Sequence, residues 1–280
     1  MTKSSKESPK FYCPLFNFEI DNQKENSDSI ILLAEDKTPF KRLKFVGNTT
    51  LKGIKKSQLQ TRDKSITRLF LEQHVAGVFL SSFKDLPVIE IYQEENIVPL
   101  IESIILALRI FKEGDVFCKI IWSDDHNEHT VLNPFYELPN TLHYEIYSLK
   151  TEEIDQINEI FKMLIKSDFI DRRHLRIACD RLNRSYGKSM YDEKMLDFMI
   201  AFEALFMRKT SPNIGVVIAT ACSMLLGESD LERKEIYEFF VKAYKLRNKI
   251  VHGSAVDFSE IRETALRLKE HLRESILKLL

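Results

Sequence analysis

The chain has 280 residues, of which 44% are apolar and 30% charged, and its formal net charge is −1 at pH 7. This length predicts two domains or one large one, and the apolar content is enough for a core that needs no covalent staples. The balanced charge excludes a nucleic-acid-binding coat over the whole surface, although it leaves room for a local basic groove.

The first half of the chain, residues 1–150, is predicted to be an α+β domain. Short β-prone runs alternate there with polar segments. A helix is predicted over residues 97–112, ending before Gly114, and a polar loop over residues 52–64. No motif in this half indicates its role. We predict strands at residues 29–34, 44–46, 75–80, 88–92, 116–122, 129–135 and 142–147.

The second half, residues 151–280, has a helical pattern almost throughout. It contains only one proline, Pro212, and few glycines. The first helix is predicted to begin at Thr151, and Gly227 and Gly253 stand where helix-ending glycines are expected. We therefore predict an all-helical C-terminal domain. Further helices are predicted over residues 171–186, 191–207, 214–226 and 230–252, and from residue 257 onward.

The cysteines and the apolar runs indicate a cytoplasmic protein without a membrane partner. No two cysteines share a metal-type spacing such as C-x-x-C, so we expect reduced thiols buried as small hydrophobic residues. Residues 1–10 are polar and lack the apolar segment of a signal peptide. The longest apolar stretch, residues 97–111, is broken by Glu102 and Arg109 and is too short to span a bilayer. The four cysteines are Cys13, Cys118, Cys179 and Cys222.

The segment with the clearest chemical potential runs from Arg247 to His252. On a helical wheel at about 100° per residue, Arg247 projects from the middle of an apolar stripe. Because a guanidinium cannot lose its charge and is costly to bury unpaired, it needs an acidic partner, a polar cleft or a bound anion. The stripe consists of Phe240, Ala243, Tyr244, Ile250 and Val251.

Asn248 and His252 share one flank of the same helix, about 100° and 140° from Arg247. Histidine moves protons near neutral pH, and arginine stabilises charge on phosphoryl oxygens. The three side chains therefore suit acid–base chemistry on a phosphate ester. An Arg-x4-His spacing is short enough to arise by chance, so the residue types alone favour a paired core arginine and an ordinary helix-end histidine.

The apolar helix predicted over residues 191–207 offers two acids as partners. Between residues 195 and 206 only Asp197 and Glu203 are polar. A helix that is apolar on all sides is a central helix, and an acid inside it is rarely left unpaired. We hypothesise that Glu203 or Asp197 pairs with Arg247 or with another base in the core. The alternative is an acid at an exposed edge, which fits Asp197 best.

Three blocks of the second half resemble a known family. Residues 244–253, Tyr-Lys-Leu-Arg-Asn-Lys-Ile-Val-His-Gly, resemble the Arg-x4–6-His signature helix of HEPN domains. The acid-bearing block at residues 195–206 and the small-residue block at residues 219–227 precede it, in the order found in the Apea-like HEPN group. The resemblance covers roughly residues 152–280. A match over several blocks is more specific than the Arg-x4-His spacing alone.

The resemblance implies a HEPN-type helical bundle that dimerises, so that two signature helices face each other. Many members of the family are metal-independent ribonucleases, often in toxin–antitoxin or antiphage systems, and need no cofactor. By resemblance, Arg247, His252 and Asn248 are the catalytic residues. The expected partners are RNA, a second copy of the chain, and an antitoxin or regulatory protein. Some HEPN domains are catalytically silent, so the alternative is a non-catalytic module for RNA or nucleotide binding or for dimerisation.

The helix predicted over residues 171–186 is rich in arginine. Seven lysines and arginines stand against three acids between residues 166 and 188. Such an excess suits a surface that follows a phosphate backbone toward the site. The alternative is a solvated helix face with internal ion pairs. The arginines predicted to bind RNA are Arg172, Arg173, Arg176 and Arg184.

One further motif, an H-x-x-H pattern at His126 and His129, lies among acidic residues. Histidines and acids are possible metal ligands, but the strand-like flanks and the lack of a third ligand favour a polar hairpin turn, so we predict no metal site. The sequence contains no P-loop, no G-x-G-x-x-G and no G-x-S-x-G motif. It therefore offers no support for nucleotide hydrolysis or a serine hydrolase.

Overall fold

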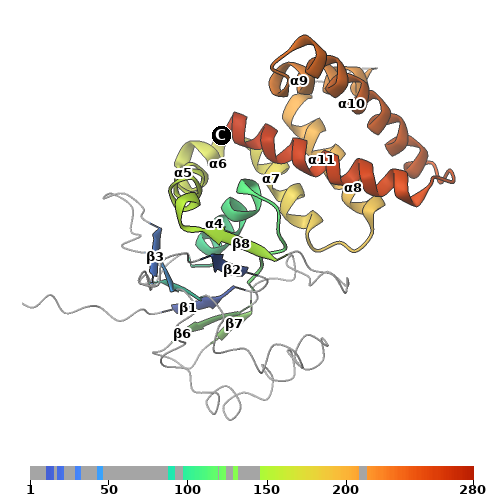
Figure 1. Ribbon diagram of the computed structural model, residues 1–280. Coiled ribbons are helices and arrows are strands. Elements are labelled where there is room, and N and C mark those ends of the chain that lie inside the picture. Colours follow the sequence, from blue (N-terminus) through green and yellow to red (C-terminus); the bar gives the residue numbers. More distant parts are fainter. Residues whose placement is uncertain are drawn as a thin grey trace, which may run out of the picture. The chain divides into compact units, whose positions relative to one another are not determined.

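The computed structural model describes residues 11–15, 18–21, 29–32, 43–46, 88–91, 97–118, 120–123, 129–131, 146–207 and 213–280. The chain divides into two compact units (Figure 1). One unit contains the strands, and the other contains Glu102–Glu113 together with Glu159–Leu280. The helical unit thus includes a segment from the first half of the chain, which the predicted division at residue 150 leaves out.

The described strands of the first unit form a six-stranded antiparallel sheet and a separate parallel pair. The pair consists of β2 (Phe18–Asp21) and β8 (Tyr147–Lys150). The sheet has the order β3-β4-β5-β1-β6-β7. Its strands are β1 (Phe11–Pro14), β3 (Ser29–Leu32), β4 (Leu43–Val46), β5 (Val88–Ile91), β6 (Ile120–Ser123) and β7 (His129–Val131).

Several predicted strands differ from the described ones. β3, β4, β5 and β7 coincide with predicted strands, but β6 begins at Ile120 rather than at residue 116, and β8 begins only at Tyr147. Residues 75–80 and the loop predicted over 52–64 lie outside the described residues. β1 and β2 are absent from the predicted set. β1 carries no alternation of apolar and polar residues, and the alternation in β2 extends over only four residues, the lower limit of a strand signal. The α+β assignment of the first half stays a prediction.

The cysteines correct one expectation and confirm another. Cys118 is disulfide-bonded, so the expectation of reduced thiols is wrong for this residue. Cys179 and Cys222 are free and buried. Burial raises the pKa of both thiols, that of Cys179 to about 12. These two thiols therefore stay protonated near neutral pH and serve as small hydrophobic core residues rather than as nucleophiles.

The prediction of helices throughout the second half is confirmed for the residues that the structure describes. The helix predicted over residues 171–186 is divided at Arg172, whose backbone (φ −83°, ψ 65°) leaves the helical region. A 3-10 turn at Thr151–Glu153 leads into α5. The helices are α5 (Ile154–Ile165), α6 (Ser167–Asp171), α7 (Arg173–Ser185), α8 (Tyr191–Phe206), α9 (Ile214–Leu226), α10 (Asp230–Val251) and α11 (Phe258–Leu279).

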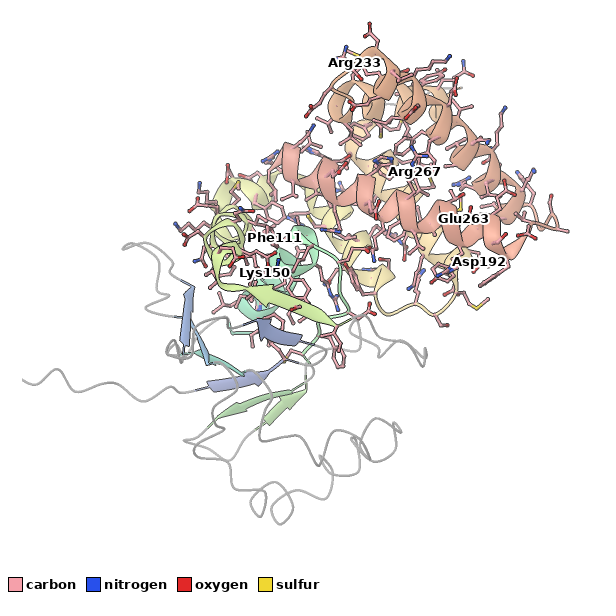
Figure 2. The ribbon with its side chains drawn as sticks, viewed as in Figure 1. Phe111, Lys150, Asp192, Arg233, Glu263 and Arg267 are labelled. Carbon is pink, nitrogen blue, oxygen red and sulfur yellow. The ribbon has the colours of Figure 1, made fainter. Side chains whose placement is uncertain are left out.

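The N-terminus of α10 is defined by a capping box. The Glu232 backbone N–H donates to Ser229 Oγ at 3.2 Å, and the Ser229 N–H donates to the Glu232 carboxylate at 3.1 Å. Two N–H groups at the helix start thereby find partners. One residue on, Arg233 (labelled in Figure 2) donates from Nε to the Gly227 carbonyl at 3.2 Å. The end of α9 and the start of α10 are therefore tied together.

The C-terminus of α10 is closed by a Schellman motif. Gly253 has a φ of +70°, a conformation that costs little only for glycine. Its N–H donates to the Ile250 carbonyl at 3.0 Å, and the Ser254 N–H donates to the Lys249 carbonyl at 2.9 Å. Gly253 thus ends the helix as its sequence predicts, and His252 is the capping residue.

α8 is the central helix of the helical unit. It packs against α7, α9, α10 and α11, and its buried side chains include Phe198 and Phe202. The Phe202 ring meets the ring of Phe240 on α10 edge to face, with 4.8 Å between the ring centroids. The all-round apolar sequence of this helix predicts such a central position, and the packing confirms it.

The apolar helix α4 (Ile97–Phe111) contributes its C-terminal half to the helical unit. Buried Arg109 donates to the side-chain amide oxygen of Asn183, and its guanidinium carbon lies 4.3 Å from the ring centroid of Tyr186. Arg273 of α11 donates to the last two carbonyls of α4 at 3.1 and 2.7 Å. Because these groups are paired, the helix end can be buried. Within the described ranges, no helix combines the length and apolarity needed to cross a membrane.

Candidate functional site

The predicted catalytic residues lie within the last six positions of α10 and its cap. Arg247 is 26% exposed, Asn248 is half-buried, and His252 is exposed. The apolar stripe around Arg247 is buried at Phe240 and Ala243. Toward the helix end it emerges into solvent, since Val251 is 52% exposed. Arg247 therefore stands where α10 leaves the core, with its guanidinium at the edge of the bundle.

Arg247 contacts groups from both α8 and α10. Its Nη2 lies 3.7 Å from Oε1 of Glu203, which is 27% exposed. Its Nη1 donates to Oδ1 of Asn248 at 3.3 Å, and its guanidinium carbon lies 5.7 Å from the ring centroid of Tyr244. Of the two acids that the sequence offers, Glu203 is thus the one beside Arg247. At 3.7 Å the ion pair lies well beyond the usual N–H···O hydrogen-bond distance of about 2.7–3.2 Å, and the Arg247–Asn248 hydrogen bond, at 3.3 Å, is weak because it lies just past the end of that range.

Two polar atoms in this cluster have unmet hydrogen-bonding capacity. The Nε of Arg247 and Oε1 of Glu203 are both buried and, among the described residues, have no hydrogen-bond partner. A buried polar atom without a partner is costly, and the cost is larger for a charged group. The guanidinium is therefore held by one long ion pair and one weak hydrogen bond, and it retains a donor for a further acceptor.

Asp197 has a different environment from Glu203, although both lie on α8. It is only 2% exposed, so the interpretation of Asp197 as an acid at an exposed edge is wrong. Its carboxylate pairs with Arg181 at 2.8 Å and with Lys188 at 2.9 Å. Asp197 therefore joins the end of α7 and the following turn to the central helix, and it takes no part in the Arg247 cluster.

The arginines predicted to bind RNA fall into two groups. Arg172 donates to the carbonyls of Leu279 and Leu280, at 3.2 Å for Leu280, and Arg184 pairs with Asp180 at 3.1 Å. Arg173 and Arg176 are exposed on α7. Arg172 is thus bonded to the end of α11, Arg184 forms an ion pair on the surface of α7, and Arg173 and Arg176 are exposed on the same helix.

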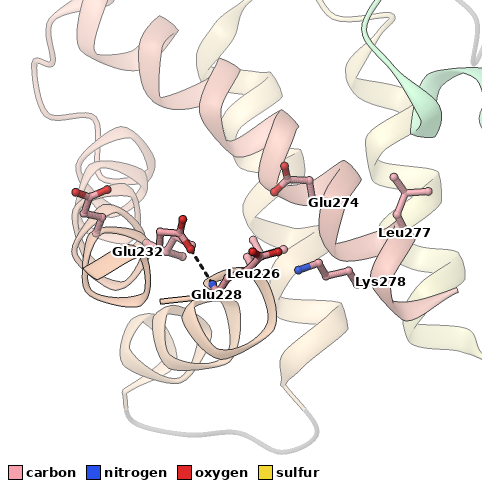
Figure 3. Close-up of a pocket in the computed structure, with 8 residues that line it drawn as sticks. Leu226, Glu228, Glu232, Glu274, Leu277 and Lys278 are labelled. Atoms are coloured by element: carbon pink, nitrogen blue, oxygen red, sulfur yellow. Dashed lines mark hydrogen bonds between the residues drawn. The ribbon is translucent and has the colours of Figure 1, made fainter. Parts of the chain in front are cut away.

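A pocket of about 400 Å³ lies at the opposite end of α10 and does not include the Arg247 cluster (Figure 3). Three helices line it: the end of α9, the start of α10 and the end of α11. Its charged residues are Glu228, Glu232, Glu235, Glu274 and Lys278, beside three aliphatic side chains. Twelve residues separate Glu235 from Arg247, a rise of about 18 Å along the helix. No motif in the sequence signals this pocket.

No group of three or more metal-ligating side chains occurs among the described residues. His129 lies in β7, paired opposite Trp122 of β6 in an antiparallel register. The residues between these two strands, including His126, lie outside the described residues.

The chain was also compared with known proteins. No protein-family model, curated protein or solved structure matches it.

Proposed function

We propose that the chain is a metal-independent endoribonuclease of HEPN type that acts as a homodimer. The proposal rests on the resemblance of the α8, α9 and α10 segments to Apea-like HEPN domains. It is supported by one observation above all: Arg247 lies about one quarter exposed where the apolar stripe of α10 emerges from the core, and among the described residues its Nε has no hydrogen-bond partner. A donor of this kind suits a phosphate oxygen.

In the proposed reaction, the RNA 2′-hydroxyl attacks the adjacent phosphorus. His252 of one copy takes the proton from the 2′-hydroxyl, the 2′-oxygen–phosphorus bond forms, and the bond to the 5′-oxygen breaks. His252 of the second copy donates a proton to that leaving oxygen. The products are a 2′,3′-cyclic phosphate and a 5′-hydroxyl end. Arg247 stabilises the charge on the phosphoryl oxygens, and Asn248 holds the guanidinium.

The direct experiment incubates pure protein with mixed RNA in the presence of EDTA. We expect the wild-type protein to cleave RNA, and Arg247→Ala and His252→Ala each to reduce the rate by about 10²–10⁴-fold, the usual contribution of such groups. Lys249→Ala is the matched control because Lys249 is an exposed cation between them on the same helix. Undiminished cleavage by His252→Ala, or loss of cleavage with EDTA, would contradict the proposal.

The second candidate is a non-catalytic HEPN module that binds RNA or nucleotide or serves for dimerisation. The ion pair between Glu203 and Arg247 favours it, because an arginine neutralised within its own chain does not require a phosphate. This second candidate would be supported if the wild-type protein sediments as a dimer but cleaves no RNA. We also propose a role in antiphage defence or in a toxin–antitoxin pair, with an antitoxin or regulatory protein as partner. The proposed location is the cytoplasm.

A further inference from the structure

The contact between Glu203 and Arg247 has the features of a replaceable interaction. At 3.7 Å between Oε1 and Nη2 the pair lacks a hydrogen bond, and each side chain is about one quarter exposed. Among the described residues, Glu203 Oε1 and Arg247 Nε have no hydrogen-bond partner. A phosphate, in contrast, accepts two parallel N–H bonds from a guanidinium at about 2.7–2.9 Å. Exchanging the carboxylate for a phosphate therefore satisfies more of the arginine's donors.

Glu203 opposes such an exchange in two ways. The negative charge of Glu203 offsets the positive charge of Arg247, so the site attracts an anion less strongly. The Glu203 carboxylate also repels a phosphate that approaches the same guanidinium. Asp197 does not share this role, because two cations at 2.8 and 2.9 Å hold it in the core. Asn248, whose Oδ1 accepts from Arg247 at 3.3 Å, keeps the guanidinium at the helix edge when the carboxylate is displaced.

We propose that Glu203 is a built-in competitor for Arg247, an autoinhibitory contact that lowers the affinity of the site for the phosphate of a nucleic-acid strand. The inference rests on the proposed function, because it takes Arg247 as the phosphate-binding residue. Glu203 is a positioning residue in this scheme: it acts on substrate through Arg247 and touches no reacting atom.

The test measures binding separately from cleavage. The probe is a fluorescent 2′-O-methylated RNA oligonucleotide, which has no free 2′-hydroxyl to attack its phosphates, and the readout is fluorescence anisotropy at low salt. We expect Glu203→Gln to bind this probe about two- to fivefold more tightly than wild type, the range that removal of a partly exposed ion pair allows. A plot of the logarithm of its affinity against the logarithm of the salt concentration should be steeper by up to about 0.7, which is the contribution of one phosphate contact to a single strand.

Four further variants identify the cause of a gain. Glu193→Gln removes one negative charge from an exposed position of the same helix and should leave affinity unchanged. Glu203→Asp keeps the charge and should bind like wild type. Glu203→Ala removes the carboxylate as Gln does and should show the same gain, so it tests the inference if Glu203→Gln does not fold. Glu203→Gln combined with Arg247→Ala should lose the gain, because the gain acts through the guanidinium.

The outcomes separate the inference from the proposed function. If wild-type protein cleaves RNA but Glu203→Gln binds the probe no better, the competitor role is wrong and the ribonuclease stands. If wild-type protein cleaves nothing while Glu203→Gln gains affinity through Arg247, the competitor role holds and the catalytic proposal fails. An equal gain for Glu193→Gln would also overturn the inference, since it would reflect net charge alone.

Discussion

Two carboxylates on one helix show how burial decides what an acid does. Asp197 and Glu203 lie six residues apart on α8, yet Asp197 is 2% exposed and has two cationic partners, whereas Glu203 is 27% exposed and has one distant partner. A buried ion pair holds elements together because breaking it leaves an uncompensated charge. A half-exposed and long pair can instead be exchanged for a ligand at small cost.

A second residue-scale feature is His271 on α11, which sits against aromatic rings. Its ring centroid lies 5.4 Å from that of Phe239 and 5.6 Å from that of Phe240. Burial lowers the pKa of His271, nearby Arg267 lowers it further, and Glu274 at 3.7 Å opposes the shift. Protonation is therefore easier in the unfolded chain than in the folded one.

The predicted consequence is a pH-dependent stability. As pH falls through about 6.5, the ordinary histidine pKa, the unfolded chain binds a proton that the folded one resists, so stability present above that pH is lost below it. We expect the melting temperature to fall between pH 7.5 and 5.5, and to fall less in His271→Gln, which cannot titrate. Identical pH profiles for the two proteins would show that His271 makes no contribution.

At the scale of elements, the contact between α9 and α10 positions the site. Gly215 of α9 lies against Tyr244 of α10, the residue whose ring adjoins Arg247. A Cβ added at Gly215 would meet the Tyr244 ring at 2.7 and 2.8 Å, which is closer than side chains tolerate. The glycine therefore allows the two helices to approach this closely, and the positions of the Tyr244 ring and of the adjoining Arg247 depend on that approach.

Gly215→Ala is expected to destabilise the helical unit. Alanine is the better helix former by about 1 kcal/mol, but overpacking costs about 1–3 kcal/mol, so the clash should prevail. The midpoint of urea unfolding measures the change. Thr220→Ala, at an exposed position of the same helix, is the control and should be neutral or slightly stabilising. A stabilised Gly215→Ala protein would mean that Tyr244 moves aside without cost.

At the scale of the whole molecule, a net charge of −1 conceals local differences. The exposed arginines of α7 form a basic surface, while four glutamates gather at the pocket between α9, α10 and α11. Long-range attraction of a polyanion depends on such local surfaces rather than on the net charge. Arg172 is bonded to carbonyls at the end of α11 and is less available to a ligand, and the charge of Arg184 is offset by Asp180 on the same helix surface.

RNA binding should accordingly depend on the exposed part of the basic surface. Replacing Arg173 and Arg176 together by Gln should weaken binding of the 2′-O-methylated oligonucleotide and reduce its salt dependence, by about 0.7 in the logarithmic slope for each lost phosphate contact. The control is Lys234→Gln, which removes an exposed cation at the start of α10. The loss of affinity is compared for each charge removed. Equal effects per charge would indicate that α7 holds no specific path for the strand.

The sequence by itself determined the local features of this protein. Helical periodicity after residue 150, the glycine that ends α10, and an arginine that needs a counter-charge all follow from residues within a turn or two of each other. Tertiary structure alone decided which acid is that counter-charge, since Glu203 and Asp197 carry the same signal in the α8 sequence. It also decided the disulfide at Cys118, the short strands β1 and β2, and the place of α4 in the helical unit. These outcomes depend on distances between segments far apart in the chain, and periodicity within one element carries no information about such distances.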